Sequence, residues 1–312
     1  MPHSRRTWCL ALCCTAILAA GGCAAIDAQQ RQMIFQPSDR VWRNASTEGM
    51  RDVWIDHHNG VPLADQASAS TPDAIRLHAL WMEGPSAQSP VLLYLHGARW
   101  NVTGSTPRMR RMNALGFAVL AVDYQGFGQS SKGLPSEASA RADALAAWRW
   151  LAQRYPQRPR FIFGHSLGGA IGIDLATQVD DEQGVLVENT FTSIVDMART
   201  FKWGWLPVGP FVTQRFETLN KVAQVGAPLV VVHGDADQLV PYAMGQELFA
   251  RAGEPKRWIA VPGGTHHNTN GLAQLQYQQT LQTLWPQWWP ATVPSTQQAG
   301  TADAQGSHTA TR

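Results

Sequence analysis

The sequence predicts an α/β fold, in which helices cover both faces of a mainly parallel sheet. Between residues 51 and 289, short apolar segments rich in β-branched residues alternate with longer segments of helical periodicity. Continuous apolar runs, such as those over 91–93 and 230–232, are typical of strands buried on both faces, as in parallel sheets. No repeat of about 20–50 residues is visible, which argues against solenoids and propellers.

Eight strands and five helices are expected in this alternation. The strands lie near 53–55, 75–81, 91–95, 118–122, 161–163, 185–187, 229–232 and 258–261. The helices lie at about 106–115, 137–154, 167–179, 243–252 and 272–285. The second helix is the clearest, because Ser136 precedes it as an N-cap residue and its apolar residues share one face; these are Ala138, Ala142, Leu145, Trp148 and Leu151.

The composition is that of a globular chain without electrostatic bias. The 312 residues are 44% hydrophobic and 15% charged, which is enough apolar material for a sizeable core. The net charge of +2 comes from 25 basic and 23 acidic residues. Two of the basic residues, Arg5 and Arg6, lie in a segment expected to be removed, which leaves 25 − 2 = 23 against 23. Without a net charge or a basic stripe, nucleic-acid binding is not expected.

The first 22 residues have the features of an export signal. A basic stretch with Arg5 and Arg6 precedes an apolar run over 9–20, which is too short to cross a bilayer as a permanent helix. Small residues follow at Gly21 and Gly22. The paired arginines leave twin-arginine export open beside the Sec route.

Cys23 is the expected point of lipid attachment. The segment from Ala20 to Cys23 resembles the lipobox of bacterial lipoproteins, with Ala20 where leucine is usual. The resemblance implies that cleavage before Cys23 exposes a cysteine that carries several acyl chains, which give durable anchoring. Ala24 follows in place of the aspartate that marks inner-membrane retention, so the resemblance favours the outer membrane. A plain signal with a free Cys23 is the alternative.

The chain divides into four expected parts. They are a signal peptide over 1–22, a lipid-anchored tether and entry segment over 23–50, an α/β domain over 51–289 and a disordered tail over 290–312. Within the domain, an insertion over 189–226 has room for two short helices and a small apolar rim, but not for a cap domain. A shallow site of this kind suits short or medium acyl groups, or one acyl chain presented at a membrane surface.

A nucleophile elbow is predicted where the strand over 161–163 turns directly into a helix. The turn reads Gly164-His-Ser166-Leu-Gly168, and its tightness requires residues without bulk two positions before and after the serine. The backbone N–H of Leu167 opens the helix and is placed to donate to an oxyanion. The pattern alone is weak evidence, and its position at a strand–helix junction gives it weight.

Partners for the serine follow in chain order. The buried strand over 229–232 is followed by Asp235 and Asp237, and the last strand is followed by His266 and His267. Serine, aspartate, histidine is the order of α/β-hydrolase triads. The spacing alone does not show which aspartate and which histidine of each pair belongs to the triad.

From about residue 75 to 285 the sequence resembles the α/β-hydrolase family. Within that family it is most similar to the BEM46/ABHD13/ABHD17-like subgroup, also described as serine aminopeptidase S33-like hydrolases. Besides the elbow, the resemblance is carried by Tyr94-Leu-His-Gly97, Asp123-Tyr-Gln-Gly126-Phe-Gly128-Gln-Ser130, His233-Gly-Asp-Ala-Asp237, Val240-Pro241 and Gly263-Gly-Thr-His266.

The resemblance implies a catalytic triad. It makes Ser166 the nucleophile, His266 the base that takes its proton, and Asp237 the carboxylate that orients the histidine. It selects Asp237 over Asp235 because the acid lies three residues before Val240-Pro241, and it selects His266 over His267 through Gly-Gly-Thr-His. Glu188, at the end of the sixth strand, stays open as an alternative acid.

A second oxyanion donor is expected beside Leu167. In this fold it comes from the loop after the third strand, and the candidate is the amide of Ala98. The subgroup usually continues His-Gly-Asn-Ala-Gly-Asn, whereas this chain has Ala98-Arg99-Trp100 after the first Gly. Arg99 and Trp100 either face an anionic or aromatic substrate group or lie at the surface and pack.

No metal site or nucleotide cofactor is expected. His57-His58 has no third ligand at metal spacing and is expected in a surface turn. The cysteines all lie within the first 23 residues, so thiol zinc sites and internal disulfides are excluded from the rest. No phosphate-binding glycine motif follows the first strand. The tryptophans at 203, 205, 285, 288 and 289 are expected to pack on the core or insertion rather than contact lipid.

Together these features predict a serine hydrolase of the cell envelope. The preferred activity is that of an esterase or thioesterase, which cleaves a small acyl ester or thioester through an acyl-enzyme. Two alternatives stay open: a serine peptidase or amidase of the S33-like type, and a non-catalytic lipoprotein that keeps the fold as a scaffold. The presence of Ser166, Asp237 and His266 in order argues against the scaffold. The oligomeric state is left open.

Overall fold

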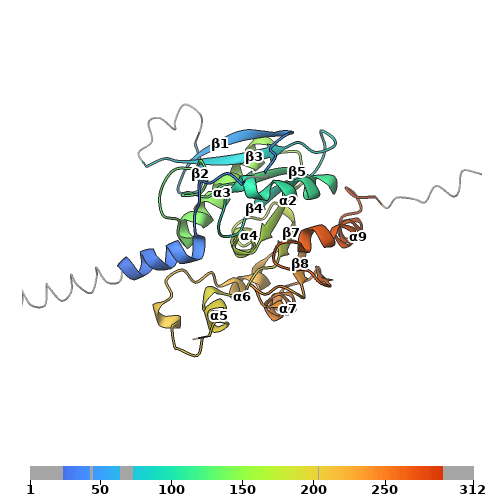
Figure 1. Ribbon diagram of the computed structural model, residues 1–312. Helices are drawn as coiled ribbons and strands as arrows, with labels where there is room; N and C mark the ends of the chain where they lie inside the picture. Colours follow the sequence, from blue (N-terminus) through green and yellow to red (C-terminus); the bar gives the residue numbers. More distant parts are fainter. Residues whose placement is uncertain (1–23, 43–44, 64–72, 203, 291–312) are drawn as a thin grey trace, which may run out of the picture.

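The computed structural model describes residues 24–42, 45–63, 73–202 and 204–290. The expected signal peptide, Cys23 and all but the first residue of the expected tail lie outside these ranges. Figure 1 shows the described chain as a sheet with helices on both sides.

The sheet runs in the order β2-β1-β3-β5-β4-β6-β7-β8-β9 and confirms the predicted α/β architecture. The six strands from β5 to β9 along this order pair in parallel, while β2, β1 and β3 pair antiparallel at one edge. The strands are β1 (Met50–His58), β2 (Val61–Pro62), β3 (Ile75–Met82), β4 (Val91–Leu95), β5 (Ala118–Val122), β6 (Arg160–His165), β7 (Glu182–Glu188), β8 (Leu229–Gly234) and β9 (Lys256–Val261).

The described sheet has nine strands where eight were predicted, because β1 continues into a hairpin. Asn59 and Gly60 both have positive φ, 49° and 78°, and join β1 to the two-residue strand β2. Asn-Gly is the preferred sequence for such a two-residue turn. The signal was therefore present in the sequence, but the second strand is too short to show periodicity.

Helices cover the two faces of the sheet in two groups. The helices α3, α4 and α7 bury their apolar residues in one cluster, and α2 and α9 bury theirs in a second cluster on the opposite face. The helices are α2 (Val102–Ala114), α3 (Glu137–Arg154), α4 (Leu167–Ala176), α5 (Ile194–Arg199), α6 (Thr218–Lys221), α7 (Tyr242–Arg251), α8 (Thr269–Leu272) and α9 (Gln274–Leu284).

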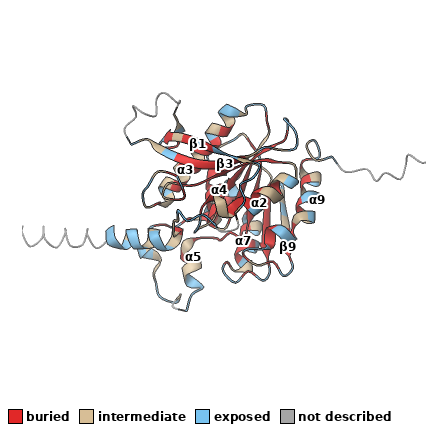
Figure 2. Cartoon of the chain, turned by 45° about the horizontal axis from the view of Figure 1, so that its top comes forward, coloured by how far each residue is buried: buried red, intermediate tan, exposed pale blue. Residues whose placement is uncertain are grey.

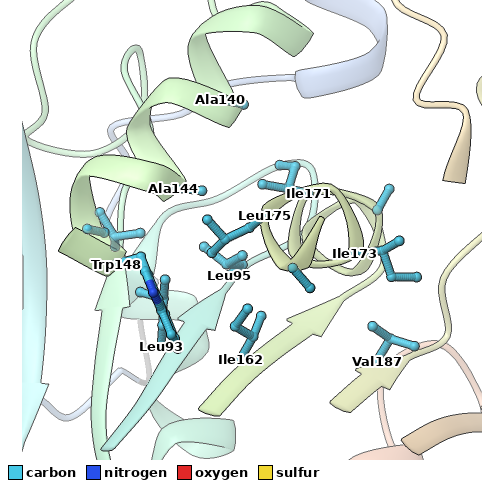
Figure 3. Packing of buried hydrophobic residues seen from close by; sticks show 14 of the residues in the cluster. Leu93, Leu95, Ala140, Ala144, Trp148, Ile162, Ile171, Ile173, Leu175 and Val187 are labelled. Carbon is cyan, nitrogen blue, oxygen red and sulfur yellow. The ribbon is translucent and has the colours of Figure 1, made fainter. Parts of the chain in front are cut away.

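Helix α3 begins where predicted and buries Trp148 and Leu151 of the predicted face, but the buried face also extends to residues that were not predicted. Ser136 caps it and accepts a hydrogen bond from Ser139 N at 3.1 Å. The predicted face included Ala138, which is exposed, whereas Ala140 and Ala144 are fully buried beside α4. Figure 3 shows the two alanines on α3 facing α4. Small side chains let the two helices approach closely, so the buried stripe follows residue size as well as hydrophobicity.

The strands contribute buried side chains to the core on both faces of the sheet. Leu93, Leu95 and Ile162 come from the neighbouring strands β4 and β6 and lie in one buried cluster with Trp148, as Figure 3 shows. Figure 2 shows the strands as the most buried part of the chain. This rigid sheet sets the positions of the loops at its edge.

The insertion over 189–226 holds α5 and α6, the two short helices that were expected, with two 3-10 turns at Gly209–Phe211 and Val222–Gln224. The C-terminal tryptophans pack on the second cluster as predicted, and Trp285 is buried. Trp205 in the insertion is 75% exposed, so the expectation of packing is wrong there. Trp203 lies outside the described residues.

The segment expected as a tether is helical over residues 24–35. In Figure 1 this helix is the blue one beside the insertion. Gln30 donates from Nε2 to the carbonyl of Phe211 at 2.7 Å, so the helix is docked on the insertion. Within the described ranges, none of the helices is both long and apolar enough to cross a membrane.

Candidate active site

The predicted site residues gather at one edge of the sheet. Ala98 follows β4, Ser166 follows β6, Asp237 follows β8 and His266 follows β9. These four strands are parallel, so their carboxyl ends meet at the same edge. Ligands of open α/β sheets bind at this edge.

Ser166 has the backbone of a nucleophile elbow. Its φ of 55° and ψ of −123° lie in a region that residues with a Cβ rarely adopt. A Cβ on Gly164 would meet Gly168 O at 2.3 Å, and a Cβ on Gly168 would meet Leu95 O at 2.0 Å. Only glycine fits at either position, which is the physical reason for the spacing of the motif.

Asp237 and His266 form a directed hydrogen bond. His266 Nδ1 donates to Asp237 Oδ2 at 2.8 Å, and both side chains are buried. The other carboxylate oxygen, Oδ1, accepts from the amides of Leu239 at 2.8 Å and Val240 at 3.0 Å. Both carboxylate oxygens are therefore engaged, and a histidine that donates from Nδ1 has Nε2 as its basic nitrogen.

The same contacts act on the charge of Asp237. Burial alone would raise the pKa of this carboxyl group, but the hydrogen bond and charge of His266, with the Val240 and Leu239 amides, lower the pKa below the usual aspartate range. The carboxylate is thus ionised at neutral pH.

Asp235 binds the loop before His266 and not the histidine side chain. Its Oδ1 accepts from the amide of Gly263 at 2.7 Å and so fixes the turn before His266. The structure therefore brings Asp237, and not Asp235, to the histidine. His267 is exposed and contacts His266 only ring to ring, at 5.4 Å between centroids.

Glu188 is engaged elsewhere. Arg108 donates from Nε to Glu188 Oε1 at 3.0 Å, and the hydroxyl of Tyr277 donates to Oε2 at 2.8 Å. The carboxylate is fully buried, and each of its oxygens accepts one of these bonds. The alternative acid of the sequence analysis is thus part of a structural ion pair.

The backbone of His266 is fixed by a largely buried and a buried side chain, Arg108 and His165. Arg108 Nη2 donates to the His266 carbonyl at 3.2 Å, and His165 Nε2 donates to the same oxygen at 2.9 Å. Burial, helped by the charges of Arg108 and His266, lowers the pKa of His165 well below its usual range. His165 is therefore a neutral donor, which sequence reasoning did not identify because its partner lies 101 residues away.

Ser166 lies beside this pair. The rings of His165 and His266 are 4.8 Å apart between centroids, which places the elbow against the histidine loop. Among the described residues, no hydrogen bond joins Ser166 Oγ to His266. Hydrolases without substrate often show this bond as long or misaligned, and it tightens when substrate binds.

Two backbone amides are available for an oxyanion. Neither Leu167 N nor Ala98 N donates to an acceptor in the part of the chain that the structure describes. A Cβ on Gly97 would meet Ser166 Cβ at 3.1 Å, so the loop with Ala98 lies directly against the elbow. Donors from these two places are the usual pair of an oxyanion hole in this fold.

His57 and His58 were expected in a surface turn, and this expectation is wrong for His57. It is buried in β1, where its Nε2 lies 3.0 Å from Asp143 Oδ1 and its Nδ1 accepts from Gly60 N at 3.2 Å. The hairpin to β2 covers it. Within the described ranges, no group of three or more His, Cys, Asp or Glu side chains could hold a metal ion.

Comparisons with known proteins show which family the chain resembles. A family model described as serine aminopeptidase, S33, matches residues 86–210, which include Ala98 and Ser166. An uncharacterised protein of Mycobacterium tuberculosis is 30% identical over 256 residues, which cover 81% of this chain and 86% of that protein. Protein bem46 of Schizosaccharomyces pombe is 31% identical over 208 residues, 64% of this chain and 69% of that protein. The chain belongs to the BEM46-like α/β-hydrolases.

Relatives of this BEM46-like hydrolase include named enzymes. The lysophosphatidylserine lipase ABHD12 of Danio rerio is 30% identical over 198 residues, 57% of this chain and 51% of the lipase. The solved structure of an esterase from Pyrococcus furiosus superposes with a TM-score of 0.62 at 20% identity, over 82% of this chain and 98% of the esterase. The structural likeness establishes the fold. With the family, it makes the BEM46-like protein a serine hydrolase.

Proposed function

We propose that this BEM46-like hydrolase is an esterase or thioesterase with a Ser166–His266–Asp237 triad. The observation that carries the proposal is the 2.8 Å hydrogen bond from His266 to Asp237, on a loop that packs against the elbow of Ser166. A carboxylate that accepts from Nδ1 leaves Nε2 as the basic nitrogen, which is the one that must receive the proton of a serine.

The reaction follows from these positions. Ser166 Oγ attacks the acyl carbonyl carbon while His266 Nε2 takes its proton, and the resulting oxyanion is stabilised by the amides of Leu167 and Ala98. The tetrahedral intermediate collapses as His266 returns the proton to the departing alcohol or thiol. Water then attacks the acyl-enzyme by the same route and releases the acid. Asp237 stabilises the charged imidazole in both steps.

The surroundings of the site favour an acyl substrate. The insertion is short, and its apolar side chains Phe201, Trp205 and Phe211 are 64%, 75% and 69% exposed. They leave apolar surface exposed on the insertion, which suits an acyl group better than a charged peptide end. One relative is named as a lysophosphatidylserine lipase, which is in line with an acyl substrate.

Fluorophosphonate labelling tests the triad without knowledge of the substrate. We expect the probe to modify Ser166, with labelling lost in Ser166→Ala and His266→Ala; removal of the nucleophile costs about 10⁶ in rate in triad hydrolases. His267→Ala is the matched control, because it removes the neighbouring exposed ring, and it should label as wild type does. Labelling that survives in folded Ser166→Ala would disprove the assignment.

Substrate preference is tested separately, because the family model is described as an aminopeptidase. Initial rates are compared for p-nitrophenyl acyl esters of increasing chain length and for aminoacyl p-nitroanilides. We expect the esters to be cleaved with the higher kcat/KM. Preference for the anilides would favour a peptidase or amidase and reverse this ranking.

We also propose that the chain is a lipoprotein of the bacterial envelope, anchored through Cys23 to the outer membrane and facing the periplasm. The proposal rests on the lipobox-like segment before Cys23. Membrane fractionation of wild type and Cys23→Ser tests it, together with accumulation of the precursor in globomycin. A Cys23→Ser protein that stays in the membrane fraction would contradict it.

A further inference from the structure

The loop that carries Ala98 has an unfavourable backbone. The two residues after Ala98, Arg99 and Trp100, have φ values of 66° and 62°, in the left-handed region that side chains with a Cβ disfavour. Two such residues in succession do not hold their conformation by local preference. The surrounding structure must therefore impose it.

The support comes from the N-terminal arm, residues 35–42, which wraps around the oxyanion loop, residues 97–103. Arg99 N donates to the carbonyl of Phe35 at 2.8 Å, and Arg99 Nε donates to Gln36 Oε1 at 2.8 Å. These two bonds hold both the backbone and the side chain of the first left-handed residue.

Further contacts follow along the arm. Asn101 Nδ2 donates to the carbonyl of Arg40 at 3.0 Å, and the rings of Trp42 and Trp100 meet edge to face with centroids 4.3 Å apart. Arg99 and Trp100 thus pack against the arm, which decides the choice that the sequence left open.

The arm itself is fixed at its start and in its middle. Phe35 is fully buried and its ring lies 5.9 Å from that of Phe216 in the insertion. In the middle, Gly128 N donates to the carbonyl of Ser38 at 3.0 Å. The arm is therefore a built part of the domain, in line with the docked blue helix of Figure 1.

We propose that the N-terminal arm positions the oxyanion donor, which is the amide of Ala98. Gln36 is the positioning residue: it binds Arg99 and thereby holds the neighbouring Ala98 in place. This inference rests on the proposed function. Because the amide must meet an oxygen that bears charge only in the transition state, displacement of the loop should lower kcat and leave KM nearly unchanged.

The test uses single substitutions in the full domain with a p-nitrophenyl ester. We expect Gln36→Ala to lower kcat by about tenfold or more, since complete loss of one oxyanion donor costs about 10²–10³. Gln36→Glu keeps an acceptor for Arg99 Nε and should restore most of the rate. Gln30→Ala is the matched control, because Gln30 bonds to Phe211 and not to the loop, and it should keep wild-type kcat.

A trifluoromethyl ketone separates positioning from a general effect on structure, because its adduct with the serine carries an oxyanion. Its affinity should fall in Gln36→Ala in parallel with kcat/KM, while KM for the ester stays within about twofold. In a double-mutant cycle, Arg99→Ala should add little to Gln36→Ala.

Two outcomes would overturn the proposal: an unchanged kcat in Gln36→Ala, or equal losses in Gln36→Ala and Gln30→Ala. Failure of the proposed function gives a different result, namely ester hydrolysis that persists in Ser166→Ala.

Discussion

Arg108 Nε lies 3.0 Å from Glu188 Oε1, and the carboxylate of this pair is fully buried. The same guanidinium donates from Nη2 to the carbonyl of His266. A buried ion pair therefore supports the backbone of the proposed catalytic base. Arg108 connects the pair to the site, because it bonds to both Glu188 and His266.

Breaking this pair should affect stability and activity together. Arg108→Met leaves Glu188 as an uncompensated buried charge, which costs about 3–5 kcal/mol of unfolding free energy. Adding Glu188→Gln removes the charge and should recover part of the stability, but not the rate, because His266 still lacks the donor. Urea unfolding and ester hydrolysis of the single and double variants measure both. A single variant as stable as wild type would disprove the role of the pair.

Asp237→Asn should inactivate the enzyme without unfolding it. The amide can keep the bonds to Leu239 and Val240, but it no longer favours a proton on Nδ1 of His266 and a base on Nε2. In a well-studied triad the same change lowers kcat by about 10⁴. Asp235→Asn is the matched comparison and should lose far less, since an amide oxygen still accepts from Gly263. Equal losses in kcat would contradict the assignment of Asp237.

Glu182 should make stability depend on pH. Burial, with smaller contributions from Asp181 and Asp180, raises the pKa of Glu182 from 4.5 to about 7. The folded state then binds a proton more tightly than the unfolded chain, so the unfolding free energy falls as pH rises from 4.5 to about 7. Glu182→Gln should be more stable than wild type at pH 8, by on the order of 1–3 kcal/mol.

This advantage should vanish near pH 4, where wild type is protonated in both states. Asp180→Asn should give a smaller gain in the same direction, because it removes one of the charges that raise the pKa of Glu182. Thermal unfolding between pH 4 and 8 measures the difference, and a gap that is independent of pH would refute the prediction.

Gly168→Ala should disrupt the elbow. The added Cβ would lie 2.0 Å from Leu95 O and 2.6 Å from His96 O, both backbone atoms that cannot turn away. We expect a loss of about 1–3 kcal/mol or more, together with loss of labelling at Ser166. Gly226→Ala is the control, since nothing lies within 4 Å of its Cβ, and it should stay within about 0.5 kcal/mol. Equal urea midpoints for the two variants would rule out the clash.

Local patterns predicted much of the fold. All eight expected strands are present, since apolar runs that are buried on both faces leave a strong signal. The elbow was predictable because its tight turn requires glycine at two positions, and the whole motif lies within five consecutive residues. The hairpin of β2 and the buried position of His57 were missed, because a two-residue strand has no periodicity and its burial depends on α3.

The sequence by itself determined the α/β order, the elbow at Ser166 and the choice of Asp237 and His266 as candidate partners, because each depends on residue type and on order along the chain. Only the tertiary structure decided that Glu188 pairs with Arg108 and that the N-terminal arm holds the loop after Ala98. These contacts join residues from 63 to 80 positions apart. No local pattern encodes such pairings, since they arise only when the sheet has brought its loops to one edge.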